Sequence, residues 1–149
     1  MQPLRLNLGC GTRKKPGFVN VDKFKGCDPD IVADLLVGLP FNSLSVDEIV
    51  SENFLEHLPG EEFILVMNEC YRVLKVGGVA THIVPNALHP GGAAFRDPTH
   101  KIFITHETWY YFLAGHPFCD VTGFLYGIMP WKSVKVEAFN IYLRAILYK

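Results

Sequence analysis

Two glycines follow the first apolar segment of the chain, and their spacing suits a ligand-binding turn. Residues 4–8 alternate apolar and polar side chains, which predicts a strand that ends at Gly9-Cys10-Gly11. Glycine lacks a Cβ atom, so a ligand can approach this backbone closely. A dinucleotide fingerprint would place a third glycine at position 14, where the sequence has Lys14. The turn therefore favours a nucleoside ligand over NAD, with a simple tight turn as the alternative.

Two aspartates lie at the ends of the next two predicted strands, residues 18–22 and 31–34. Asp22 is placed to accept hydrogen bonds from both hydroxyls of a ribose. Asp34 is placed to accept a hydrogen bond from an adenine amino group. The alternatives are a solvated loop for Asp22 and a turn cap for Asp34.

Polar residues also follow a fourth predicted strand, residues 47–51. Glu52 and Asn53 come directly after it, and His57 follows in the same loop. Ligands of open α/β sheets bind outside the carboxyl ends of the strands, so these side chains are expected at a pocket. His57 is a candidate general base because its ordinary pKa lies near neutral pH. A structural histidine that stabilises the loop is the alternative.

A segment rich in histidine spans residues 82–116. It contains five of the six histidines, which are His82, His89, His100, His106 and His116. No two of them have the spacing of a helical or short-loop ligand pair, so no metal site is predicted. Asp97 and His100 are candidates for deprotonating a hydroxyl or an amine. Alternatively, Asp97 forms an Asx-type turn that His100 supports.

The remaining pattern predicts the elements that position these residues. Residues 61–75 have apolar side chains at helical spacing, residues 79–84 form a fifth strand, and residues 105–113 form a further helix. Residues 133–139 and 142–148 are predicted to pair as an antiparallel hairpin. The ten residues between Gly11 and Asp22 are too few for a crossover helix.

Composition limits the class of protein. The 149 residues suit a single domain, 1–149, and the net charge of −1 argues against nucleic acid as the main partner. Four well-separated cysteines suggest reduced thiols and a cytoplasmic location. No apolar run is long enough for a membrane-spanning helix, so no membrane association is predicted.

An ordered series of motifs resembles the class I S-adenosylmethionine-dependent methyltransferases, especially their small type 11 domains. The motifs are Leu6-Asn7-Leu8-Gly9-Cys10-Gly11, Asn20-Val21-Asp22, Ala33-Asp34-Leu35, Phe54-Leu55-Glu56-His57 and Arg72-Val73-Leu74-Lys75-Val76-Gly77-Gly78. The resemblance implies an α/β, Rossmann-like, mostly parallel sheet with an antiparallel C-terminal hairpin. The helix that the family usually has between its first two strands is expected to be shortened or missing.

The resemblance also implies S-adenosylmethionine as cofactor and a role for each matching residue. Gly9, Cys10 and Gly11 would line its methionine part, and Asp22 would hold its ribose. Asp34 and Leu35 would hold the adenine. Glu52 and Asn53 would approach the methionine or the sulfonium.

The prediction that follows is methyl transfer from S-adenosylmethionine to a small or medium-sized acceptor. The identity of the acceptor and the oligomeric state of the protein are left open. His100, Asp97 and His57 are the candidate bases, in that order. One alternative is a non-catalytic cofactor-binding domain of the same fold. Another is a metal-dependent hydrolase that uses the histidine-rich segment 82–116.

Overall fold

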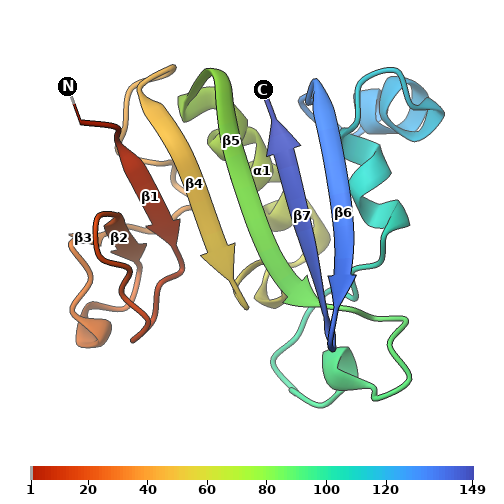
Figure 1. Cartoon of the computed structure of the whole chain (residues 1–149), viewed down its shortest axis with the longest axis horizontal. Coiled ribbons are helices and arrows are strands. Elements are labelled where there is room, and N and C mark those ends of the chain that lie inside the picture. The colour runs from red at the N-terminus through yellow and green to blue at the C-terminus, as the bar shows by residue number, and fades with distance from the viewer. Residues whose placement is uncertain (1) are drawn as a thin grey trace.

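The computed structural model describes residues 2–149, which build one seven-stranded sheet (Figure 1). The strand order is β3-β2-β1-β4-β5-β7-β6. The strands are β1 (Arg5–Leu8), β2 (Val19–Asp22), β3 (Ile31–Val32), β4 (Val46–Glu52), β5 (Leu74–Pro85), β6 (Ser133–Phe139) and β7 (Tyr142–Tyr148).

The direction of the strands divides the sheet into two parts. β3, β2, β1, β4 and β5 pair in parallel, whereas β7 pairs antiparallel with both β5 and β6. The hairpin β6–β7 has the bounds that the sequence predicts, with Asn140 at positive φ in its turn. The predicted Rossmann-like, mostly parallel sheet with an antiparallel C-terminal hairpin is therefore confirmed.

The connection between β1 and β2 contains no helix. It leaves β1 through a tight turn in which the amide of Cys10 donates to the carbonyl of Val21 at 3.2 Å and the amide of Arg13 donates to the carbonyl of Cys10 at 2.8 Å. The amide of Lys15 then donates to the side chain of Asn20 at 2.7 Å, which holds the chain against the start of β2. The expected loss of the first crossover helix is confirmed.

Helix α1 (Gly60–Val73) packs five apolar side chains against the sheet, namely Phe63, Val66, Met67, Cys70 and Val73. It ends two residues before the predicted end at residue 75. Leu74 already pairs with Val46, so the chain passes directly from the helix into β5. Gly77 and Gly78 therefore do not end the helix. The two glycines lie within β5, where the amide of Gly77 donates to the carbonyl of Lys149.

The other helical segments are short. They are the 3-10 turns η1 (Lys25–Cys27), η2 (Leu55–His57), η3 (Ala93–Phe95) and η4 (Glu107–Phe112), and the π-helical turn η5 (Phe118–Gly123). The helix predicted at residues 105–113 is a shorter 3-10 segment, Glu107–Phe112. Thr105 lies before it, and its amide donates to the hydroxyl of Thr108. Among residues 2–149, no helix has both the length and the apolar character needed to cross a membrane.

The helical segments α1 and η4 lie behind the sheet in Figure 1, and no helix formed by residues 2–149 covers the face turned toward the viewer. The core therefore lies between the sheet and α1, with Trp109, Phe112 and Trp131 buried beside β5–β7. In the same view, the arrowheads of β1, β4 and β5 point to one edge, which brings the loops that follow them together.

Candidate cofactor site at the carboxyl ends of the strands

A cavity of about 290 Å³ lies at this edge of the sheet. It is lined by the loops that follow β1, β2, β3 and β4 and by the first turns of α1. Its lining residues are Gly9, Asp22, Lys23, Ala33, Asp34, Leu35, Leu36, Asn53, Phe54, His57, Leu58, Glu62 and Val66. The first glycine and both aspartates of the sequence prediction thus line one cavity.

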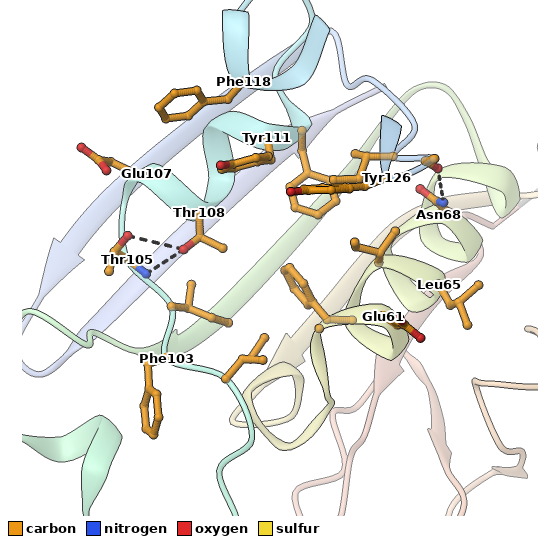
Figure 2. Close-up of a pocket in the computed structure, with 18 residues that line it drawn as sticks. Glu61, Leu65, Asn68, Phe103, Thr105, Glu107, Thr108, Tyr111, Phe118 and Tyr126 are labelled. Atoms are coloured by element: carbon orange, nitrogen blue, oxygen red, sulfur yellow. Dashed lines mark hydrogen bonds between the residues drawn. The ribbon is translucent and has the colours of Figure 1, made fainter. Parts of the chain in front are cut away.

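A larger cavity of about 1100 Å³ lies on the other side of α1, between that helix and the segments around η4 and η5. Figure 2 shows its mostly apolar wall, with Leu65, Phe103 and Tyr126 among the residues that line it. None of the predicted cofactor or catalytic residues lines this cavity. The smaller cavity is therefore the candidate site, because the chemistry predicted from the strand ends converges there.

Gly9 shapes the floor of the cavity. Its φ of +59° lies in the left-handed region, and a Cβ atom at this position would come within 2.4 Å of the Phe54 ring. The next glycine, Gly11, donates its amide to Oδ2 of Asp22 at 2.8 Å. The amide of Phe24 donates to the other oxygen, Oδ1, at 2.9 Å. The carboxylate of Asp22 is held in place and each oxygen keeps a further lone pair for a ligand.

Asp34 and Leu35 form the wall that follows β3. The amide of Leu36 donates to Oδ1 of Asp34 at 3.0 Å, which is the Asx-type turn expected as the alternative role of this residue. Asp34 is nevertheless exposed beside the cavity, and its Oδ2 has no hydrogen-bond partner among residues 2–149. Leu35 is buried in the core and also lines the cavity.

Three of the predicted cofactor residues do not line the cavity. Cys10 is buried, and its thiol donates to the carbonyl of Gly11 at 3.4 Å. Burial, together with the nearby Asp22 carboxylate, raises the pKa of this thiol. Gly11 acts through Asp22, as described above. Glu52 forms an ion pair with Lys15 at 2.7 Å instead of facing the cavity, whereas its neighbour Asn53 does line it.

A cluster of ionisable side chains adjoins the cavity through His57. One ligand-type atom from each of Glu56, His57 and His100 lies within 4.8 Å of those of the other two. The rings of His57 and His100 meet edge to face at 4.9 Å between centroids. Nε2 of His100 lies 4.0 Å from Oε1 of Glu56 and 3.9 Å from Oδ2 of Asp97.

Hydrogen bonds hold the loop of Asp97 against His57. Oδ1 of Asp97 accepts the amide of Thr99 at 2.8 Å and its hydroxyl at 2.6 Å, which is the predicted Asx-type turn. The Thr99 hydroxyl oxygen lies 3.1 Å from Nδ1 of His57. Of the three candidate bases, only His57 lines the cavity, whereas Asp97 and His100 lie next to it in this cluster.

Glu56 is the residue that the sequence reasoning does not single out. It appears there only as part of the motif Phe54-Leu55-Glu56-His57. Its side chain is 2% exposed, and neither carboxyl oxygen has a hydrogen-bond partner among residues 2–149. Burial raises the pKa of this carboxyl to about 7. A glutamate beside a histidine at a predicted strand end is the signal that could have pointed to it.

The histidine-rich segment does not act as a unit. His82 lies in the core, where Nδ1 is 2.8 Å from the hydroxyl of Ser51 and the ring stacks on Trp109. Burial lowers the pKa of His82 to about 3, so this histidine is neutral at physiological pH. Among residues 2–149, His100 is the one histidine of the segment that joins a cluster of metal-ligating side chains.

Comparison with known proteins agrees with this fold. Residues 10–81 match the family described as "Methyltransferase domain". An S-adenosylmethionine-dependent methyltransferase from Archaeoglobus fulgidus superimposes with a TM-score of 0.77 at 18% identity, over 99% of this chain and 86% of that one. No curated protein matches the sequence.

Two other solved structures resemble the chain at similarly low sequence identity. The complex of DhpI with SAM and HEP has a TM-score of 0.67 at 14% identity, over 97% of this chain and 78% of that one. A chain from the complex between the Haloferax volcanii Trm112 methyltransferase activator and a methyltransferase has a TM-score of 0.65 at 15% identity, over 99% of this chain and 82% of that one.

Proposed function

We propose that this chain transfers a methyl group from S-adenosylmethionine to a small or medium-sized acceptor. The match of residues 10–81 to a methyltransferase family and the fold shared with S-adenosylmethionine-dependent methyltransferases support this proposal. The observation that carries the proposal is the convergence of four strand-end loops on one cavity, with Gly9, Asp22, Asp34 and Asn53 in its wall. The cavity volume of about 290 Å³ lies near the lower end of the range for small-molecule sites.

The residues of this cavity fit an adenosine-bearing cofactor, and the fold and the family match support S-adenosylmethionine. We assign Asp22 to the ribose hydroxyls, because its fixed carboxylate keeps free lone pairs. Asp34 and Leu35 would hold the adenine. Gly9, Cys10 and Gly11 would lie beside the methionine part of the cofactor, and Glu52 and Asn53 would lie toward its sulfonium. Because Cys10, Gly11 and Glu52 do not line the cavity, these three residues would support its wall.

The chemistry needs little from the protein besides positioning. When bound, S-adenosylmethionine would supply an electrophilic methyl carbon for in-line attack by the acceptor, with S-adenosylhomocysteine as the leaving group. The chain orients the two partners and excludes water. Where the acceptor must lose a proton, we propose His100, Asp97 and His57 as the candidate bases. His57 has direct access to the cavity, and the other two adjoin it.

Calorimetric titration with S-adenosylhomocysteine tests the cofactor site. We expect saturable one-to-one binding by the folded protein, and a loss of affinity of about tenfold or more in Asp22→Asn, because a charge-assisted hydrogen bond contributes about 1.5–3 kcal/mol. Asp120→Asn, in η5, is the matched control and should bind as the wild type does. Absence of saturable binding by folded wild-type protein would remove the proposal.

A methyl-transfer assay with labelled cofactor then separates an enzyme from a non-catalytic domain of the same fold. The enzyme should methylate at least one member of a panel of small hydroxyl, amine and thiol acceptors. Binding of S-adenosylhomocysteine without transfer to any of them would favour the non-catalytic domain. A cytoplasmic location remains our expectation, and it agrees with the buried free thiols of Cys10, Cys70 and Cys119.

A further inference from the structure

Three side chains of types that bind transition metals, one carboxylate and two imidazoles, converge from two distant loops. Glu56 and His57 belong to η2, which follows β4, whereas His100 belongs to the loop between β5 and η4. One ligand atom of each lies within 4.8 Å of the others. We propose that Glu56, His57 and His100 form a binding site for a divalent transition-metal ion at the edge of the cofactor cavity.

The first argument is the carboxyl group of Glu56. It is 2% exposed, and neither oxygen has a hydrogen-bond partner among residues 2–149. Buried polar groups in proteins are nearly always hydrogen-bonded or bound to a metal, because an unpaired one costs free energy. Nε2 of His100 lies 4.0 Å from Oε1 of Glu56, which is too far for a hydrogen bond. An ion between the two side chains would satisfy both.

The second argument is the hydrogen bonding of the two histidines. Nδ1 of His100 lies 2.7 Å from the carbonyl of Ala94, so Nδ1 carries the proton. The Thr99 hydroxyl donates to Asp97, so its oxygen accepts from Nδ1 of His57. In the neutral form of each ring, Nε2 is therefore the nitrogen that keeps its electron pair for a metal ion. Metal-bound histidines have this arrangement, in which the second ring nitrogen donates to a carbonyl, a carboxylate or another acceptor.

The ligand set selects the kind of ion. Two imidazoles and one carboxylate suit Zn²⁺, Fe²⁺, Co²⁺ or Ni²⁺, whereas Mg²⁺ and Ca²⁺ prefer oxygen ligands alone. Metal–nitrogen distances near 2.0–2.1 Å place neighbouring ligand atoms about 3–3.5 Å apart, so the cluster would contract by roughly 1 Å on binding. The carboxylate of Asp97, 3.9 Å from Nε2 of His100, is close enough to serve as a fourth ligand or as a base.

The position suggests what the ion would do, and this part rests on the proposed methyl transfer. His57 lines the cofactor cavity, so an open coordination position could take an oxygen or nitrogen atom of the acceptor. A metal ion lowers the pKa of such a group and fixes its direction of attack. His57 and His100 would then be ligands, and Asp97 would be the remaining candidate base.

Titration of the chelator-treated protein with Co²⁺ tests the site without reference to activity. We expect one equivalent of Co²⁺ to produce visible d–d absorption bands that Zn²⁺ abolishes by competition. Glu56→Gln and His100→Asn should each weaken binding by more than about 100-fold, since loss of outer-shell partners alone costs 10–100-fold. His106→Asn, which changes a histidine outside the cluster, is the matched control and should bind Co²⁺ as the wild type does.

Thermal unfolding is a second measurement, for the case in which a variant folds too poorly for the Co²⁺ titration. Zn²⁺ should raise the thermal unfolding midpoint of the wild type and of His106→Asn, but not that of Glu56→Gln. Unchanged Co²⁺ affinity in both cluster variants, or no binding by the wild type, would overturn the proposal. Because S-adenosylhomocysteine can be titrated in the presence of chelator, a missing metal site and a missing cofactor site give different results.

Discussion

The buried carboxyl group of Glu56 should make the stability of the metal-free protein fall between pH 5 and pH 8. Burial raises the pKa of this group from 4.5 to about 7 in the folded state, so the fold favours the protonated form. Its contribution to stability is complete below pH 4.5 and is lost as the pH rises through 7. At 1.36 kcal/mol per pKa unit, the total loss is about 3 kcal/mol, of which roughly 2.5 kcal/mol falls between pH 5 and pH 8.

The charged groups that face Glu56 act in opposite directions. His100, when protonated, lowers its pKa, and the carboxylate of Asp97 raises it, but burial is the largest cause. Glu56→Gln keeps the shape of the side chain and removes its titration. The variant should therefore lack this slope, and its stability relative to the wild type should improve by about 2–3 kcal/mol from pH 5 to pH 8.

Urea denaturation of both proteins at pH 5, 6, 7 and 8, with chelator present, measures this difference. Titrating groups that do not interact with Glu56, such as His82, contribute equally to both proteins and cancel. A difference in the free energy of unfolding that changes by less than about 0.5 kcal/mol over the range would show that Glu56 is solvated or hydrogen-bonded when charged, and the reasoning would fail.

Four further substitutions test the site and the core. Gly9→Ala should abolish S-adenosylhomocysteine binding and destabilise the fold by several kcal/mol, because its Cβ would lie 2.4 Å from the Phe54 ring. Gly11→Ala has open space around its Cβ, so it should lower the free energy of unfolding by only about 1 kcal/mol. Burial lowers the pKa of His82 to about 3, so the neutral ring stabilises the fold above pH 6.5. This stability is lost as the pH falls, by about 2 kcal/mol at pH 5. In urea denaturation, the free energy of unfolding of His82→Gln should therefore depend less on pH in the acid range than that of the wild type. Arg72→Lys should lower the free energy of unfolding by about 1–2 kcal/mol, because the guanidinium donates to the carbonyls of Leu39 and Phe41 and to Glu69; a loss below about 0.3 kcal/mol would contradict this anchoring role.

Strand ends were the most predictable part of the molecule. Period-two alternation predicts a strand at residues 4–8, and the glycines at positions 9 and 11 predict the turn that ends it, so β1 and its loop follow from local rules. The hairpin at residues 133–148 is equally local, since Asn140 tolerates the positive φ of its turn. Convergence of Gly9, Asp22 and Asp34 then follows from the parallel order of the strands.

What failed depends on contacts between distant residues. The end of α1 is set by the pairing of Leu74 with Val46, which helix propensity does not describe. Glu52 is turned away from the cavity by Lys15, and no spacing rule predicts that ion pair. The cluster of Glu56, His57 and His100 exists because the loop after β5 folds back onto η2, where the amide of Lys101 donates to the carbonyl of Glu56.

The helix-free face of the sheet has a consequence for how the chain tolerates sequence change. Parallel strands are usually covered on both sides, so every position in them is constrained. In β5, however, Ala80, His82 and Val84 are buried while the alternate residues Thr81 and Ile83 remain half-buried. If every position of β5 and β7 is substituted in turn, tolerant and intolerant positions should alternate along each strand. In a sheet covered on both faces, neighbouring positions would be equally intolerant.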